Sequence, residues 1–86
     1  MYIMESFKVA IVIPAFNEED TIFKVIESVK NYGLVIVVND ASKDKTMEIA
    51  TDAGAIVVNH EENQGYDMAL NSGFLKAREF DCDGVI

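Results

Sequence analysis

Apolar residues along this chain occur in short continuous runs, separated by segments with helical spacing. The three clearest runs are rich in β-branched residues and cover residues 9–13, 34–38 and 55–58. Continuous apolar runs are typical of strands buried on both faces, as in parallel sheets. Pro14 is expected to end the first strand, because proline has no N–H group to donate to a neighbouring strand. Residues 84–86 are interpreted as the start of a fourth strand.

Three helices are expected between these strands, over about residues 18–31, 45–53 and 66–79. Asn17 and Asp44 are the expected N-caps of the first two helices, because short polar side chains accept from free N–H groups there. Gly33 and Gly54 suit the two helix ends. The expected inward-facing residues are Ile22, Val25, Ile26 and Val29 in the first helix, Met47, Ile49, Ala50 and Ala53 in the second, and Ala69, Leu70, Gly73, Phe74 and Ala77 in the third.

The order of elements is therefore β-α-β-α-β-α-β, which predicts an α/β fold with a Rossmann-like parallel sheet covered on both faces. Residues 1–86 are interpreted as a single partial domain. In such sheets, ligands bind beyond the carboxyl ends of the strands. The segments expected to carry function are therefore 14–18, 39–44 and 59–65.

The composition narrows the function classes. The formal net charge is −8, which argues against a nucleic-acid partner bound through a basic face. Cys82 is the single cysteine, which fits a reducing cytosol. No apolar run approaches the roughly 20 residues of a membrane span. We therefore expect no membrane span in this chain and a cytoplasmic location, in solution or at the membrane surface.

The loop after the first strand carries carboxylates where nucleotide-binding loops usually carry glycines. Neither G-x-G-x-x-G nor G-x-x-x-x-G-K-[ST] is present. Glu18, Glu19 and Asp20 are expected in the first turn of the first helix, where they would repel a phosphate. A bound nucleotide should therefore place its base near this helix. Asp40 could accept hydrogen bonds from a base imide or a ribose hydroxyl, although Asn39 and Asp40 could equally form a simple turn.

Three motifs in the order and spacing seen here resemble the family 2 glycosyltransferases of the GT-A fold, such as the dolichol-phosphate mannosyltransferases. The motifs cover residues 12–19 (VIPAFNEE), 37–46 (VVNDASKDKT) and 63–73 (NQGYDMALNSG). The resemblance implies that this chain is the nucleotide-sugar-binding half of a glycosyltransferase domain. It also implies a nucleotide site formed by Pro14, Ala15, Asn17, Glu18, Asp40 and Gly65.

Some positions depart from the family pattern. Ala41 replaces a common glycine, so that a turn with positive φ would be strained there. In the family, a D-x-D motif after the fourth strand binds Mg²⁺ or Mn²⁺, and this chain ends at Ile86, within that strand. The complete enzyme is expected to need such a metal, but neither its D-x-D ligands nor any catalytic residue is identified in this chain.

Asp81 and Asp83 are candidate metal ligands by spelling alone, since Asp81-Cys82-Asp83 reads as D-x-D. They are expected at the amino end of the fourth strand, opposite the ligand site, and a solvated loop is the preferred interpretation. Residues 80–86 also resemble the first motif of haloacid-dehalogenase-type phosphatases, but the end of a helix, and not a strand, is expected directly before Asp81. His60, the only histidine, is expected to be a loop residue.

The favoured function is transfer of a sugar from a UDP- or GDP-linked donor to a lipid-phosphate or saccharide acceptor. This chain would supply the donor-nucleotide site and be inactive alone. The alternative is a non-catalytic nucleotide-binding module acting through a partner. A nucleotidyltransferase is disfavoured by the acidic loop at 18–20. An incomplete domain exposes apolar surface and a sheet edge, so a homo-oligomer or a missing C-terminal half is the expected partner.

Overall fold

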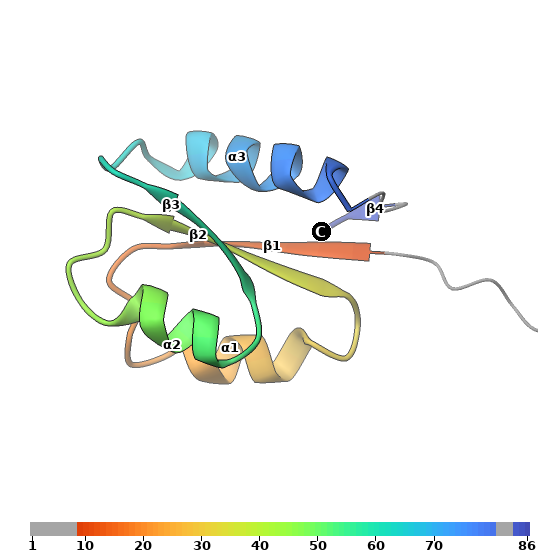
Figure 1. Cartoon of the computed structure of the whole chain (residues 1–86), viewed down its shortest axis with the longest axis horizontal. Helices are drawn as coiled ribbons and strands as arrows, with labels where there is room; N and C mark the ends of the chain where they lie inside the picture. Colours follow the sequence, from red (N-terminus) through yellow and green to blue (C-terminus); the bar gives the residue numbers. More distant parts are fainter. Residues whose placement is uncertain (1–8, 81–83) are drawn as a thin grey trace, which may run out of the picture.

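The computed structural model describes residues 9–80 and 84–86. Four parallel strands form one sheet in the order β3-β2-β1-β4. Helices α1 and α2 cover one face of this sheet, and α3 covers the other (Figure 1). This arrangement confirms the predicted Rossmann-like α/β fold. The elements are β1 (Val9–Ala15), α1 (Ile22–Val29), β2 (Leu34–Asp40), α2 (Thr46–Asp52), β3 (Ile56–His60), α3 (Tyr66–Arg78) and β4 (Gly84–Val85).

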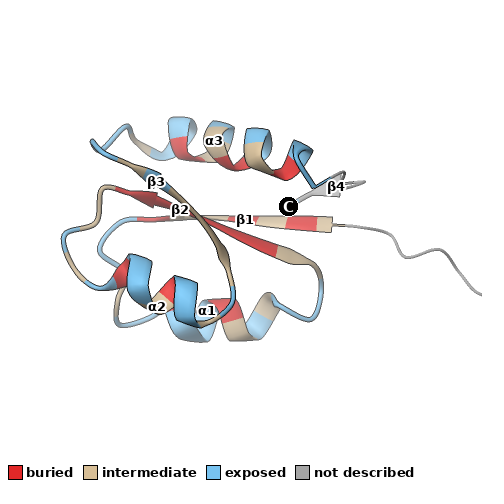
Figure 2. Cartoon of the chain, in the orientation of Figure 1, coloured by how far each residue is buried: buried red, intermediate tan, exposed pale blue. Residues whose placement is uncertain are grey.

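The core consists of two layers because successive side chains of a strand point to opposite faces. Alternate residues of β1 and β2 pack against α1 and α2, and the residues between them pack against α3. The buried residues of all three helices lie toward the sheet (Figure 2). Strand β2 is buried along nearly its whole length, as expected for a central strand with helices on both faces. The α1–α2 layer contains Ala15, Ile22, Ile26, Val35, Val37 and Ala50, and the α3 layer contains Ala10, Val12, Ile36, Val38, Ala69 and Ala77.

The strands extend further than their apolar runs predict. Strand β1 continues through Pro14, which is in register with Val38. Proline is tolerated there because the described contacts of β1 with the segment on its other side, residues 84–86, lie at Val9, Ala10 and Val12, before Pro14. Strands β2 and β3 likewise end on polar residues, Asp40 and His60. Two side chains that were expected in loops are therefore held in the sheet.

Helix α1 begins later than predicted. It starts at Ile22, and Glu18, Glu19 and Asp20 lie in the turn before it. Asn17 does not cap this helix: its φ is 53° and its side chain accepts a hydrogen bond from Lys43 N–H. The predicted cap and the predicted acidic first turn are both wrong, because contacts with the β2–α2 loop hold this segment in a different conformation.

Helix α3 packs against the sheet through small residues rather than through its largest apolar ones. Ala69, Gly73 and Ala77 recur every four residues and are buried. Phe74 was expected to face inward but is exposed, and Val25 and Met47 on the other two helices are exposed as well. None of the helices within the described ranges is long and apolar enough to cross a membrane.

Candidate nucleotide site

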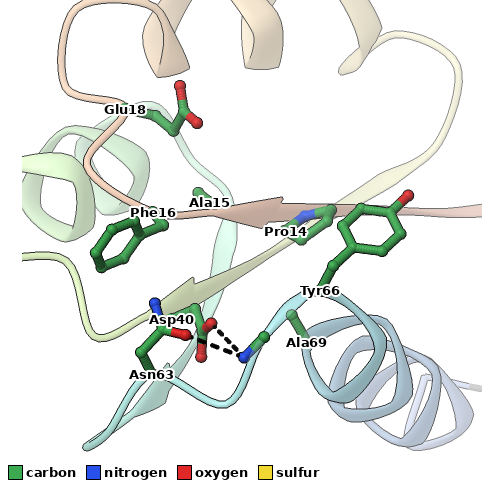
Figure 3. Close-up of a pocket in the computed structure, with 9 residues that line it drawn as sticks. Pro14, Ala15, Phe16, Glu18, Asp40, Asn63, Tyr66 and Ala69 are labelled. Carbon is green, nitrogen blue, oxygen red and sulfur yellow. Dashed lines mark hydrogen bonds between the residues drawn. The ribbon is translucent and has the colours of Figure 1, made fainter.

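A cavity of about 260 Å³ opens at the carboxyl ends of β1 and β2, beside the amino end of α3. Figure 3 shows the β1 side chains on one side of it and Asp40, Asn63 and the start of α3 on the other. Phe16 and Tyr66 are both substantially exposed, so their rings are available to a ligand. The lining residues are Pro14, Ala15, Phe16, Glu18, Asp40, Asn63, Gly65, Tyr66 and Ala69.

Asp40 is the central polar group of this site. Its residue exposure is only 5 %, yet it lines the cavity. One carboxylate oxygen, Oδ1, accepts from Gln64 N–H at 2.8 Å, and the other, Oδ2, accepts from Gly65 N–H at 2.9 Å. Gly65 has a φ of 87°, a conformation that glycine adopts without strain. Asp40 therefore fixes the loop that leads into α3.

The pKa of Asp40 is held below its ordinary value of 3.8. Burial alone raises the pKa of this carboxyl, because it disfavours the charged form. The hydrogen bonds donated by Gln64, His60 and Gly65 favour the carboxylate and outweigh burial. Asp40 is consequently a charged acceptor at neutral pH.

His60 connects Asp40 to α3, which corrects its assignment to a loop. Its Nδ1 lies 2.8 Å from Asp40 Oδ1, and its Nε2 lies 2.7 Å from Ser72 Oγ. The side chains of His60 and Asp40 are 7 % and 6 % exposed, so this contact is shielded from water. The pairing follows from strand register, since Asp40 and His60 are partners in the parallel β2–β3 ladder. That register was the signal in the sequence that could have found it.

Side chains of the β2–α2 loop and of Thr46, the first residue of α2, accept hydrogen bonds from three successive N–H groups of the β1–α1 loop. Asn17 N–H donates to Ser42 Oγ at 2.9 Å, Glu18 N–H to Thr46 Oγ1 at 2.8 Å, and Glu19 N–H to Asp44 Oδ2 at 3.2 Å. In many nucleotide-binding folds, N–H groups at this position hold a phosphate. Here the protein's own oxygens already accept from them.

Asp44 serves both loops. Its Oδ1 accepts from Thr46 N–H at 2.9 Å, which ties down the start of α2, although Lys45 rather than Asp44 is the N-cap residue. The Thr46 hydroxyl makes a further short contact with the same oxygen. Partial burial raises the pKa of Asp44, but the hydrogen bonds from Thr46 and Glu19 outweigh it and leave the pKa below its ordinary value.

Ala41 adopts the positive φ that its position in the β2–α2 loop was suspected to require. Its φ is 64°. For a residue with a Cβ atom this left-handed conformation costs about 1–2 kcal/mol. The loop therefore keeps a glycine-like turn and carries strain at Ala41.

The structure brings most of the predicted site residues together. Five of them line the cavity, whereas Asn17 does not and instead holds the β2–α2 loop through Lys43 N–H. Phe16 and Asn63 also line the cavity, and both lie in the segments 14–18 and 59–65 that were expected to carry function. Sequence reasoning did not assign Tyr66 or Ala69 to the site, although both lie in the third motif. Asp81 and Asp83 lie outside the described residues. The five that line the cavity are Pro14, Ala15, Glu18, Asp40 and Gly65.

Within the described part of the chain, no group of three or more His, Cys, Asp or Glu side chains could hold a metal ion. The cavity contains only two carboxylates, Glu18 and Asp40. Both oxygens of Asp40 already accept protein hydrogen bonds. These residues do not fit a divalent metal site.

Comparison with known proteins finds similarity over the part of the chain that contains the three motifs. The family model described as glycosyl transferase family 2 matches residues 10–79. An uncharacterized protein of Methanocaldococcus jannaschii, MJ1222, is 39 % identical over 90 % of this chain and 36 % of its own length. A UDP-N-acetylglucosamine–dolichyl-phosphate N-acetylglucosaminyltransferase of Methanococcus voltae is 32 % identical over 85 % of this chain and 37 % of its own.

Solved structures of a sugar-transferring enzyme are also similar to this chain. The glucosyl-3-phosphoglycerate synthase of Mycobacterium tuberculosis superposes with a TM-score of 0.69 at 33 % identity, over 81 % of this chain and 30 % of that one. The same enzyme in complex with Mn²⁺, UDP and glucosyl-3-phosphoglycerate superposes with a TM-score of 0.66, at 33 % identity over 73 % of this chain and 27 % of that one. The chain thus spans about a third of the length of its relatives. With the family's motifs around one cavity and its model matching most of the sequence, this chain belongs to glycosyl transferase family 2.

Proposed function

We propose that this chain binds the nucleotide of a sugar donor, in a protein that transfers the sugar to a lipid-phosphate or saccharide acceptor. The observation that carries the proposal is the cavity at the ends of β1 and β2, with the charged Asp40 in its wall. A carboxylate has about four acceptor positions, and three are used by His60, Gln64 and Gly65. One position on Oδ2 is left for a donor group of a ligand.

The base, rather than the phosphates, belongs in this cavity. The N–H groups of residues 17–19 already donate to Ser42, Thr46 and Asp44, so they offer nothing to a phosphate. Glu18 lines the cavity and would repel one. The Phe16 and Tyr66 rings instead provide apolar faces for a planar base. The diphosphate would then lie outside the cavity.

Uridine is the favoured base. Asp40 can accept a hydrogen bond from the imide N3–H of uracil. The N1–H of guanine could donate to Asp40 in the same way. The structural neighbours from Mycobacterium tuberculosis were solved with UDP and with UDP-glucose. The relative from Methanococcus voltae is named for a UDP-linked donor and a dolichyl-phosphate acceptor. These names support a UDP-sugar and a lipid-phosphate acceptor for this chain.

A divalent metal is expected for the complete enzyme, because the structural neighbours include complexes with Mn²⁺. Its ligands are not supplied by the cavity described above. We therefore propose that this chain binds the nucleotide base without the metal, and that only binding of the diphosphate depends on the metal.

Titration calorimetry of the protein with UDP, GDP and CDP, with and without Mn²⁺, tests this function. CDP is the matched ligand, since cytosine has an acceptor at N3 where uracil has a donor. We expect UDP to bind at least about tenfold more tightly than CDP, because a buried acceptor without a donor is costly. Equal affinity for UDP and CDP would refute base reading by Asp40.

Asp40→Asn is the matching protein variant, with Asp44→Asn as its control, because Asp44 holds a loop in a similar way but does not line the cavity. We expect Asp40→Asn to weaken UDP binding by about tenfold or more, since a hydrogen bond to a charged group is worth about 1.5–3 kcal/mol. Asp44→Asn should weaken binding less. The assignment fails if the two variants bind UDP alike.

A further inference from the structure

We propose that His60 is a positioning residue of this site: by joining Asp40 to Ser72 it holds the Asp40 carboxylate against loop 63–65. The inference rests on the proposed function, because the loop it fixes borders the proposed nucleotide cavity. It adds a residue that neither lines the cavity nor belongs to the three sequence motifs.

The geometry gives His60 a specific part in this network. It is the last residue of β3, its Nδ1 contacts Asp40 at the end of β2, and its Nε2 contacts Ser72 on α3. One side chain thus links two strands to the helix that carries Tyr66 and Ala69 into the cavity. Because the link is almost fully buried, water does not replace it readily.

Asp40 needs this contact because a carboxylate can rotate about its terminal bond. Gln64 N–H and Gly65 N–H bind different oxygens, so both bonds form only when the carboxylate plane lies within a narrow range of orientations. His60 Nδ1 lies against the same oxygen as Gln64 N–H and favours that orientation. In this orientation Oδ2 keeps one acceptor position for the proposed ligand. His60 would thereby help to hold both the carboxylate and the loop that it fixes, which supplies Asn63 and Gly65 to the cavity lining.

Asp40, His60 and Ser72 occur in the order of an acid–base–nucleophile triad. Neither His60 nor Ser72 lines the cavity, and Ser72 lies within a helix packed on the sheet. The serine hydroxyl is therefore not among the groups that face the proposed substrate cavity. The arrangement suits a fixed hydrogen-bond chain and not nucleophilic catalysis.

Two substitutions of His60 separate its two contacts. The amide nitrogen of Asn lies where His carries Nδ1, and the amide nitrogen of Gln lies where His carries Nε2. His60→Asn therefore keeps the bond to Asp40 and loses that to Ser72, whereas His60→Gln does the reverse. Loss of the histidine ring is common to both. Loss of ring packing alone would disturb the smaller Asn variant at least as much as the Gln variant.

The experiment compares wild type, His60→Asn, His60→Gln and Ser72→Ala by UDP titration and by amide NMR of Gln64 and Gly65. We expect about tenfold weaker UDP binding in His60→Gln and a loss of at most about threefold in His60→Asn and Ser72→Ala. The Gly65 and Gln64 amide protons should move upfield in His60→Gln only, because their bonds to the carboxylate weaken.

The two readouts separate this inference from the proposed function. Unchanged Gly65 and Gln64 signals in His60→Gln, or equal effects in the Asn and Gln variants, would overturn the positioning role. Absence of nucleotide binding by the wild type would refute the proposed function, while the amide signals would still decide the role of His60. If His60→Gln does not fold, His60→Ala takes its place: Gly65 and Gln64 signals displaced relative to those of Ser72→Ala support the role, and unchanged signals overturn it.

Discussion

Gly73→Ala should push α3 away from the sheet and deform the cavity at its amino end. A Cβ atom at residue 73 would lie 2.2 Å from Val12 Cγ1 and 3.1 Å from Val12 Cγ2. Ordinary contact between such atoms is 3.4–4 Å. Val12 cannot give way easily, because a β-branched side chain in a strand has few rotamers. The helix itself has to move.

The expected cost follows from two opposing effects. Overpacking a well-packed core costs about 1–3 kcal/mol, and this contact is severe enough for the upper part of that range. Alanine is about 1 kcal/mol better than glycine within a helix. We therefore expect Gly73→Ala to lower the free energy of unfolding by about 1–2 kcal/mol. UDP affinity should fall as well, since Tyr66 and Ala69 move with α3.

Urea unfolding followed by circular dichroism measures this change. Asn71→Ala is the control, because Asn71 lies on the exposed side of the same helix and the substitution should be neutral or slightly stabilising. The double variant Val12→Ala, Gly73→Ala removes both clashing methyl groups and should be more stable than the two single effects added together. A Gly73→Ala protein as stable as wild type would refute close packing of α3 on β1.

Two further predictions concern the loops. Ala41→Gly should raise the free energy of unfolding by about 0.5–1 kcal/mol, because relief of the positive φ of 64° exceeds the entropy cost of glycine. The control Ala53→Gly, at a φ of −77°, should lower the free energy of unfolding. A lower melting temperature for Ala41→Gly than for wild type would contradict the strained turn. Asp40 and Asp44 have depressed pKa values, so their contribution to stability is present above the ordinary value of 3.8 and is lost as the pH falls below it. Melting temperatures measured from about pH 6 to about pH 2.5 should therefore fall more for wild type than for Asp44→Asn, and equal falls would contradict the role of Asp44.

The succession of strands and helices along the chain was predictable, because strands buried on both faces have continuous apolar runs in their sequence. The polar ends of those strands were not predictable in the same way. Asn39 and Asn59 bond to each other at 3.0 Å, and Asp40 pairs with His60. Each polar residue looks like the start of a loop until the register of its neighbour is known.

The start of α1 could not be inferred from local pattern because distant side chains decide it. Thr46 and Asp44 accept from the N–H groups of Glu18 and Glu19, and these bonds keep the segment out of the helix. The inward face of α3 was misjudged for another reason. Close approach to β1 selects the small Gly73 over the larger Phe74, and hydrophobicity alone does not measure that preference.

Most of the polar groups near the cavity are used to fix its loops. Ser42, Asp44 and Thr46 engage the β1–α1 loop, and Asp40 with His60 engages loop 63–65. Such a site is formed before its ligand arrives, which reduces the entropy lost on binding. The site is also unsuited to a bound phosphate, because its own carboxylates repel negative charge. Under the proposed function, this cavity binds the base, and the diphosphate and its metal are bound elsewhere in the protein.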